Sequence, residues 1–260
     1  MAMIMFNIGI GHAQDKMISV EKELTYLKGK EASWFEKTCD DKYDYLSVYD
    51  SASRYDSIFT ARLVRYLKKY PSTVNWPFKK LSDKYVSVLT SSDSLFRIYS
   101  WDNDQGGTCR SYTTIIQFKD GKGVSVVMYP KRRSQVPDAL FYDLLTVKTD
   151  SNTFYVVAQH IQQSSYFYND AVKAFSIVNG KLNDETRVFK TKNGMQYSIS
   201  YDWKATGSII TKEGYRTDND IEFVDSTRTV KIPVVLENDS VTTRFIKYRF
   251  TGKYFEKVKE

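Results

Sequence analysis

The spacing of apolar residues divides the chain into an N-terminal helical part and a longer part with the texture of β structure. Apolar side chains recur at helical spacing over residues 55–67, and a weaker stripe runs over residues 20–34. Because positions three and four residues apart lie on one face of a helix, both stripes predict amphipathic helices. We expect a helical segment over residues 14–82 that packs against the rest of the protein. A helix pair that binds a partner is the alternative.

The second of these helices has recognisable ends. Ser51 or Ser53 is a suitable N-cap, since a serine hydroxyl accepts a hydrogen bond from a free N–H of the first turn. Lys68 and Lys69 suit the negative end of the helix dipole, and Pro71 cannot continue a helix. The sequence therefore predicts a helix that ends just before Pro71.

From about Tyr85 the chain changes to short alternating runs separated by Ser, Asp, Asn and Gly, which predict β-strands. Segments starting at Tyr85, Phe141 and Ile221 each contain a strand, a Ser/Asp turn and a second strand, followed by a hairpin that turns on Gly-Lys. We expect residues 83–260 to form an antiparallel β domain of about three repeated four-stranded units, as an incomplete propeller, a curled meander or a barrel. A chance likeness among hairpins is the alternative to a true repeat. The predicted fold class is mainly β with an N-terminal helical segment (α+β).

The first residues, MAMIMFNIGIGHAQ, carry no charge and have the pattern of a secretory leader. A short apolar run precedes the small residues Gly11 and Ala13, which predicts a signal peptide over residues 1–13 with cleavage before Gln14. A positive n-region is missing, and a buried N-terminal strand is the alternative. The run is too short to span a bilayer and no later stretch is apolar enough, so no transmembrane segment is expected. We expect export to the periplasm or the outside of the cell.

Export affects how the two cysteines, Cys39 and Cys109, are interpreted. In an oxidising compartment, two cysteines far apart in sequence most simply form a disulfide, and we expect one between them. The alternative is Cys109 as a nucleophile beside Gly106 and Gly107. A reactive thiolate needs a nearby base, however, and histidine is scarce in this chain.

The chain has a formal net charge of +7, an apolar content of 42% and an aromatic content of 15% that includes 20 tyrosines. This is the composition of a globular protein, and tyrosine favours half-buried β surfaces. The basic clusters are scattered instead of lining one helix, so nucleic acid is not an expected partner. They predict a solvated surface, with weak attraction to anionic envelope polymers or lipids as the alternative.

Three stretches stand out as a set: LFRIYSWDNDQGGTCRSYTTIIQF from Leu95, FTGKYFEKV from Phe250, and VNWPFKKL from Val74. Together they resemble exported Bacteroidetes proteins of unknown function, in which a strand ending Ser-Trp-Asp leads through a Gly-Gly-Thr loop into a strand containing Ile-Gln. The resemblance implies export and a helical start on a β body. It implies no activity and no catalytic residues.

Common catalytic and nucleotide-binding motifs are missing from the sequence, including G-x-S-x-G, H-E-x-x-H, C-x-x-C, the P-loop and G-x-G-x-x-G. Once the predicted leader is removed, His160 is the one histidine left, which excludes a histidine-rich zinc site. No resident cofactor is expected. The metal candidate is Ca²⁺ at Asp102 and Asp104, which with a turn at Gly106 have the spacing of the opening of a calcium loop, although the later acids are missing. An ordinary turn with local side-chain hydrogen bonds is the alternative.

The repeat indicates where a ligand would bind. Aligning the first two units places Asp102 and His160 at equivalent strand ends, and Glu237 ends the corresponding strand of the third. If the units lie side by side, these ends gather on one rim, and loops on a rigid scaffold often carry function. The predicted rim consists of Trp101, Asp102, Asp104, His160, Tyr166, Tyr168 and Glu237, with the two tyrosines stacking on a sugar or a protein. The alternatives are strand ends that are polar because they are exposed, and tyrosines tucked under their loop.

The function expected from these features is that of a non-catalytic exported protein that binds a glycan, a peptide or a partner protein. A carboxylate-based hydrolase acting on glycans is the first alternative, since that chemistry needs only two suitably separated acids, here Asp102 and Glu237. A structural envelope component is the second.

Overall fold

The computed structural model describes residues 3–40, 42–104, 107–121, 123–130, 138–205 and 220–258, except for the side chains of residues 3–13 and Cys39. Helices come first and strands follow. The helices are α1 (Met3–Phe35), α2 (Tyr45–Lys69) and α3 (Lys79–Ser82), with 3₁₀ turns η1 (Glu36–Cys39), η2 (Pro71–Asn75) and η3 (Asp225–Thr227). The strands are β1 (Ser87–Thr90), β2 (Phe96–Asp102), β3 (Tyr112–Asp120), β4 (Gly123–Tyr129), β5 (Leu140–Lys148), β6 (Thr153–Gln162), β7 (Phe167–Val178), β8 (Lys181–Asn183), β9 (Phe189–Thr191), β10 (Gly194–Gln196), β11 (Ser198–Lys204), β12 (Glu222–Val224), β13 (Thr229–Val235), β14 (Val241–Phe250) and β15 (Phe255–Lys257).

The two predicted helices are confirmed, but α2 begins earlier than its apolar stripe indicates. Asp44 caps it, with its carboxylate accepting a hydrogen bond from the Ser47 N–H at 3.1 Å. Ser51 and Ser53 lie inside the helix, so the prediction that one of them is the N-cap is wrong. The helix ends two residues before Pro71, as predicted.

The strands form three sheets, which we name A, B and C. Sheet A has the order β1-β2-β3-β4, sheet B the order β11-β7-β6-β5 with β8 also on β7, and sheet C the order β10-β9-β15-β14-β13-β12. Paired strands are antiparallel, apart from the parallel pair β15 and β9. The predicted fold class, mainly β with an N-terminal helical segment, is confirmed.

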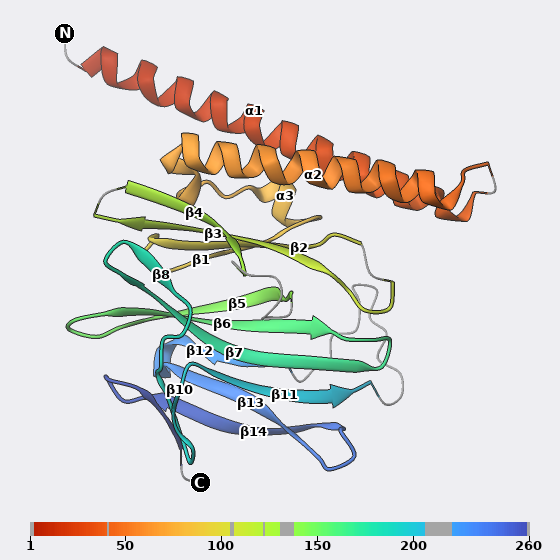
Figure 1. The fold of residues 1–260 in the computed structure, drawn as a ribbon. Coiled ribbons are helices and arrows are strands. Elements are labelled where there is room, and N and C mark those ends of the chain that lie inside the picture. Colours follow the sequence, from red (N-terminus) through yellow and green to blue (C-terminus); the bar gives the residue numbers. More distant parts are fainter. Residues whose placement is uncertain are drawn as a thin grey trace.

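Figure 1 shows these elements as layers, with the hairpin of α1 and α2 over sheet A, then sheet B, then sheet C. An apolar core fills each of the three interfaces. The core between the helices and sheet A includes Leu24, Phe59, Leu63, Trp101 and Ile115. The core between sheets A and B includes Ile98, Phe118, Tyr155 and Phe175, and the core between sheets B and C includes Val156, Val172, Val230 and Phe255.

Sheets A and B are covered on both faces, and this explains why their central strands β2, β3, β6 and β7 are buried over most of their length. In β2 the first six of seven residues are buried. A strand covered on both sides must satisfy any polar side chain inside the protein. Arg97 therefore donates a hydrogen bond to the Thr73 carbonyl at 2.7 Å, and the amide of Gln117 donates to the Thr73 hydroxyl at 2.7 Å.

The three predicted units fall on three different sheets, but they do not keep their strands to themselves, because β9 and β10 join sheet C and β11 joins sheet B. The first and third units form the consecutive meanders β1 to β4 and β12 to β15. In the second unit, β8 pairs only with the last residues of β7, and β11 from the predicted insert pairs with the earlier part. The described strands form open sheets, and no closed barrel is found among them. The units thus stack face to face, as curled meanders do.

Candidate functional site

The predicted rim consists of the ends of β2 and β6 and the turn after β13, and the structure brings these together with the end of β11 at one edge of the stacked sheets. The Arg110 N–H, just after the β2–β3 loop, donates to the carbonyl of Gln162 at the end of β6, at 3.1 Å. On the other side of sheet B, the Lys204 N–H donates to the carbonyl of Asp239 in the β13–β14 turn at 2.9 Å. Loops from all three sheets therefore meet here, although a shared edge does not by itself expose every predicted residue.

Two of the predicted rim residues are core residues. Trp101 is 1% exposed and Tyr168 is 0% exposed. The Trp101 indole N–H donates to the Asp56 carboxylate at 2.8 Å, and the Tyr168 hydroxyl donates to the Ser165 carbonyl at 3.1 Å. The prediction that these two rings contact a ligand is wrong, because their surfaces and their polar atoms are used inside the fold.

Asp102 and Asp104 form a turn that is closed by an arginine. The Asp104 N–H donates to the Asp102 carboxylate at 2.8 Å, and the guanidinium of Arg110 lies 3.4 Å and 3.3 Å from the two acids. Burial raises the pKa of Asp102 to about 6, and it also raises the pKa of Asp104. A cation that binds both carboxylates would have to displace this guanidinium. Among the described residues no group of three or more His, Cys, Asp or Glu side chains could hold a metal ion, while Gly106 lies outside them.

His160 belongs to a polar cluster that the sequence did not reveal. Its Nδ1 lies 2.6 Å from one carboxylate oxygen of Asp170, and the Trp203 indole N–H donates to the other oxygen at 2.7 Å. The rings of Tyr168 and Trp203 stack with centroids 4.4 Å apart. The pairing of His160 with Asp170 could have been found from the register of the β6–β7 hairpin, which places the two residues directly opposite each other.

The imidazole of His160 is held by a carboxylate, as the histidine of a catalytic triad is. A nucleophile next to that histidine is missing from the described residues. No serine or cysteine among them is hydrogen-bonded to the second ring nitrogen. Asp170 also accepts from Trp203, and Tyr201 approaches the same oxygen at 3.4 Å. The cluster therefore acts as a satisfied polar contact between β6, β7 and β11.

The remaining rim residues are exposed and do not face one another as a catalytic pair. Tyr166 is 67% exposed at the β6–β7 turn. Glu237 is exposed in the turn after β13. Because Glu237 belongs to sheet C, Asp102 belongs to sheet A and sheet B lies between them, these carboxylates do not flank one cleft (Figure 1).

The predicted disulfide is wrong. Cys109 is a free, exposed cysteine in the β2–β3 loop. Cys39 ends η1 at the tip of the helical hairpin, which extends past the edge of the sheets in Figure 1. The reason is that α1 continues unbroken to Phe35 and carries the following turn away from the β body.

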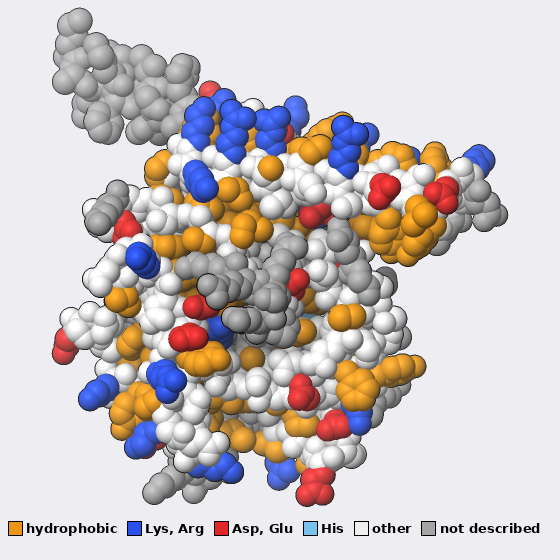
Figure 2. All heavy atoms as spheres, viewed as in Figure 1, with side chains coloured by type: hydrophobic (Ala, Val, Ile, Leu, Met, Phe, Trp, Pro, Cys, Tyr) orange, Lys and Arg blue, Asp and Glu red, His pale blue; other side chains and the backbone are white. Residues whose placement is uncertain are grey.

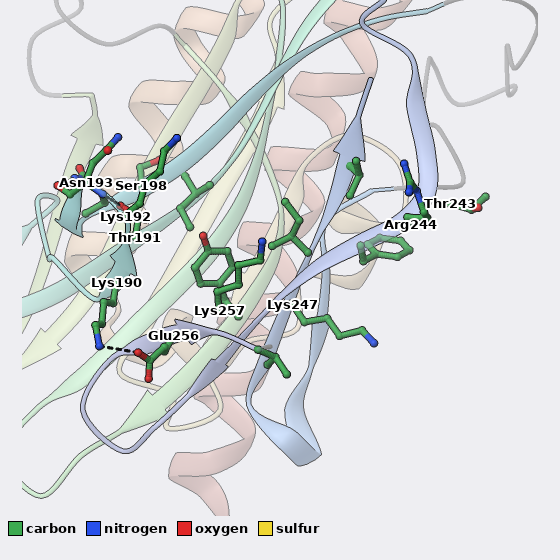
Figure 3. Close-up of a pocket in the computed structure, with 17 residues that line it drawn as sticks. Lys190, Thr191, Lys192, Asn193, Ser198, Thr243, Arg244, Lys247, Glu256 and Lys257 are labelled. Carbon is green, nitrogen blue, oxygen red and sulfur yellow. Dashed lines mark hydrogen bonds and ion pairs between the residues drawn. The ribbon is translucent and has the colours of Figure 1, made fainter. Parts of the chain in front are cut away.

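A groove on sheet C has a volume of about 1560 Å³. Its walls come from β14 and β15 on one side and from the β9–β10 hairpin and the start of β11 on the other. Figure 3 shows its side chains, with Lys190 and Glu256 paired at one end and Arg244 and Thr243 at the other. Half-buried Ile199, Ile246 and Tyr248 form apolar parts of the lining.

The groove is strongly cationic. Five of its lining residues are cationic and one is acidic: Lys190, Lys192, Arg244, Lys247 and Lys257, with Glu256 as the acid. Glu256 binds Lys190 at 2.6 Å. In the part of the chain that the structure describes, the other four cations form no ion pair. Sequence reasoning missed this site because β9 is far from β14 and β15 along the chain and the lysines are scattered.

Figure 2 shows Lys and Arg side chains in two regions of the visible face, along the outer side of the helical hairpin and low on the β body. No helix of the described chain is long and apolar enough to cross a membrane. No family model, curated protein or solved structure matches the chain. The resemblance to exported Bacteroidetes proteins and the predicted cleavage after Ala13 stay predictions.

Proposed function

We propose that the protein is an exported, non-catalytic binding protein that holds an extended anionic chain in the groove of sheet C. The observation that carries this proposal is the lining, with five cationic side chains against one carboxylate. At about 1560 Å³ the groove also exceeds the roughly 300–1,000 Å³ of small-molecule pockets. A groove of this size and charge fits a polymer segment better than a small molecule.

The strength of binding would come from several weak contacts acting together. An exposed ion pair contributes about 0.2–1 kcal/mol, and salt screens it. Four unpaired cations on one groove would therefore give a modest affinity that falls steeply as the salt concentration rises. Half-buried Ile199, Ile246 and Tyr248 add apolar contacts that salt does not weaken.

The non-catalytic part of the proposal is supported by how the candidate acids and base are engaged. Asp102 and Asp104 bind Arg110, and His160 binds Asp170. Each of these side chains has a structural partner within the described fold. The exported part rests on the N-terminal apolar run, on Ala13 and on the resemblance to exported Bacteroidetes proteins.

The test compares two variants with the same change in net charge. One carries Lys192→Glu, Lys247→Glu and Lys257→Glu in the groove, and the control carries three exposed lysines of α1 changed to glutamate, at Lys16, Lys22 and Lys30. Binding of poly-L-glutamate and of oligogalacturonate is measured by calorimetry at low and moderate salt, with neutral dextran as a negative control.

We expect the groove variant to lose about ten-fold or more in affinity and the α1 variant to lose little, because close charges act far more strongly than distant screened ones. An equal loss in both variants would show that net charge, and not the groove, attracts the polymer. No binding of either polyanion by the unmodified protein would refute the proposal.

Sequencing of the exported protein should find Gln14 at its N-terminus.

A further inference from the structure

We propose that the outer face of the helical hairpin, formed by α1 and α2, docks on the surface of an anionic lipid membrane. This inference goes beyond the proposed function, because it concerns a different face of the molecule. In Figure 1 the hairpin is the outermost layer on one side of the stacked sheets, and sheet C is the outermost layer on the other. A membrane on the hairpin would leave sheet C and its groove free to hold a ligand.

The charged side chains of the hairpin are sorted by sign between its two faces. From Gln14 to Phe35 of α1 and along all of α2, eight cations are exposed: Lys16, Lys22, Lys30, Arg54, Arg62, Arg65, Lys68 and Lys69. Three acids of the same segments are buried instead: Glu21, Glu31 and Asp56. The remaining acids are Asp15 and Asp50, which are exposed, and Glu23, which is half-buried. The outer face therefore has a large excess of positive charge.

The buried acids are engaged inside the protein and do not neutralise this face. Glu21 accepts hydrogen bonds from the Trp76 indole N–H at 3.0 Å and from the Lys80 backbone N–H at 2.7 Å. Of the eight exposed cations, Arg62 alone takes part in an ion pair with another described residue, Glu23, at 3.5 Å. A helix face that is merely solvated commonly mixes both signs in pairs three or four residues apart. Here seven cations are left without such a pair.

Apolar side chains lie between these cations on the exposed surface. Helical spacing places four residues in one outer stripe of α1: Ile18, Lys22, Tyr26 and Lys30. Ile18 is 50% exposed and Tyr26 is 59% exposed, and on α2 Ile58 is 36% exposed. Lysine and arginine beside exposed apolar and aromatic side chains are typical of helices that lie in a membrane interface. The aromatic and aliphatic groups enter the headgroup layer while the cations bind the lipid phosphates.

The extent of the face fits a membrane better than a single polymer chain. α2 has 25 residues and is therefore about 37 Å long, and α1 packs along it. Figure 2 shows Lys and Arg side chains along the outer side of this hairpin. A membrane presents negative charge over a plane and meets the cations of both helices at once. An extended chain follows one line and meets only some of them.

The first test compares sedimentation with phosphatidylcholine vesicles that contain either no anionic lipid or about one third phosphatidylglycerol. The variant Lys16→Glu, Lys22→Glu, Lys30→Glu changes the hairpin face, and Lys192→Glu, Lys247→Glu, Lys257→Glu in the groove is its charge-matched control. Each cation near an anionic membrane contributes roughly a five-fold factor in binding. We expect the hairpin variant to lose on the order of 100-fold in binding to anionic vesicles, and the groove variant less than about five-fold.

The second test locates the contact. A tryptophan in place of Tyr26 should be quenched by brominated lipid in anionic vesicles, because this side chain would enter the headgroup layer. The control is Tyr166→Trp, which is 67% exposed at the β6–β7 turn and lies outside the hairpin. Quenching is measured as the difference from the unmodified protein, which has four tryptophans of its own. We expect added quenching at Tyr26→Trp and none at Tyr166→Trp.

The following results would overturn the inference. Equal binding to neutral and anionic vesicles would assign the attraction to the uncharged residues 1–13, which all the proteins carry. Equal losses in the hairpin and groove variants would assign it to net charge. Equal quenching at both tryptophan positions would show that the hairpin is not the contact face. If the hairpin variant lost poly-L-glutamate as strongly as vesicles, its face would be a site for acidic polymers. None of these vesicle results bears on the groove, whose own test uses soluble polyanions.

Discussion

The indole N–H of Trp101 donates a hydrogen bond to the carboxylate of Asp56 at 2.8 Å, which joins the end of β2 to the middle of α2. Lys28 of α1 approaches the same carboxylate oxygen at 3.5 Å. Lys28 is 4% exposed, Trp101 1% and Asp56 8%, so three elements meet at one buried acid. The ring of Phe59 packs edge-on against Trp101 with centroids 5.1 Å apart. The Ser-Trp-Asp strand end therefore anchors the helical hairpin to sheet A.

Replacing Asp56 by alanine should destabilise the protein by about 3–5 kcal/mol, because it removes one partner of a buried charged contact and leaves the Trp101 N–H unpaired. Asp56→Asn keeps an acceptor for Trp101 and should cost less. Urea denaturation measures both. The matched control is Asp50→Ala, at an exposed position of the same helix, which should change the free energy of unfolding by less than about 0.5 kcal/mol. Equal stability of the variants at Asp56 and Asp50 would contradict the anchor.

Glu31 should make the protein less stable as the pH rises toward neutral. Burial raises the pKa of Glu31 from 4.5 to about 7, although the ammonium of Lys28 lies 2.6 Å away. The folded state thus holds a proton that the unfolded state releases. The resulting stability is fully present below about pH 4.5 and is lost as the pH rises through about 7. The loss is on the order of 3 kcal/mol.

The variant Glu31→Gln should flatten this part of the pH profile, because glutamine stays neutral at every pH. Asp102, whose pKa burial raises to about 6, contributes in the same direction in both proteins. The quantity to measure is therefore the difference between the two profiles of unfolding free energy from pH 4.5 to 7.5. Parallel profiles would show that Glu31 does not titrate in this range.

Cys109 should react with N-ethylmaleimide in the folded protein without prior reduction, because it is free and exposed. Mass spectrometry of the intact chain should show one label fewer in Cys109→Ser than in the unmodified protein. The same substitution should change the free energy of unfolding by less than about 0.5 kcal/mol, as expected for an exposed side chain. If Cys109 reacted only after reduction, this would support the disulfide that the sequence predicts.

Gly180 should tolerate alanine less well than Gly252 does. Both have positive φ, +72° and +96°, so alanine is strained at either position. At Gly180 a Cβ would also lie 2.6 Å from the Asp120 carboxylate, whereas at Gly252 nothing lies within 4 Å. We expect Gly180→Ala to lose about 1 kcal/mol more in thermal or urea unfolding than Gly252→Ala. Equal losses would mean that Asp120 moves aside without cost.

The local parts of the fold could be predicted because short-range patterns encode them. The apolar stripe of residues 55–67, Pro71 and the turn-rich texture after Tyr85 are signals that act within a few residues of where they occur. They correspond to α2, its end, and the strands of three sheets. The cap of α2 was missed because Asp44 precedes the periodic stripe by several residues and only its hydrogen bond to Ser47 identifies it.

The candidate site could not be predicted in the same way, because it depends on what covers each face of each sheet. In the sequence, a tryptophan at a strand end gives the same pattern whether a helix or solvent covers it. In the structure, α2 covers Trp101. The groove needs β9, β14 and β15 side by side, a pairing that crosses more than fifty residues of chain. The sequence by itself determined the helices, the hairpins and the excess of positive charge, since these follow from local pattern and composition. Only the tertiary structure decided which aromatic rings are buried and where the lysines gather, because burial and charge proximity arise from contacts between distant segments.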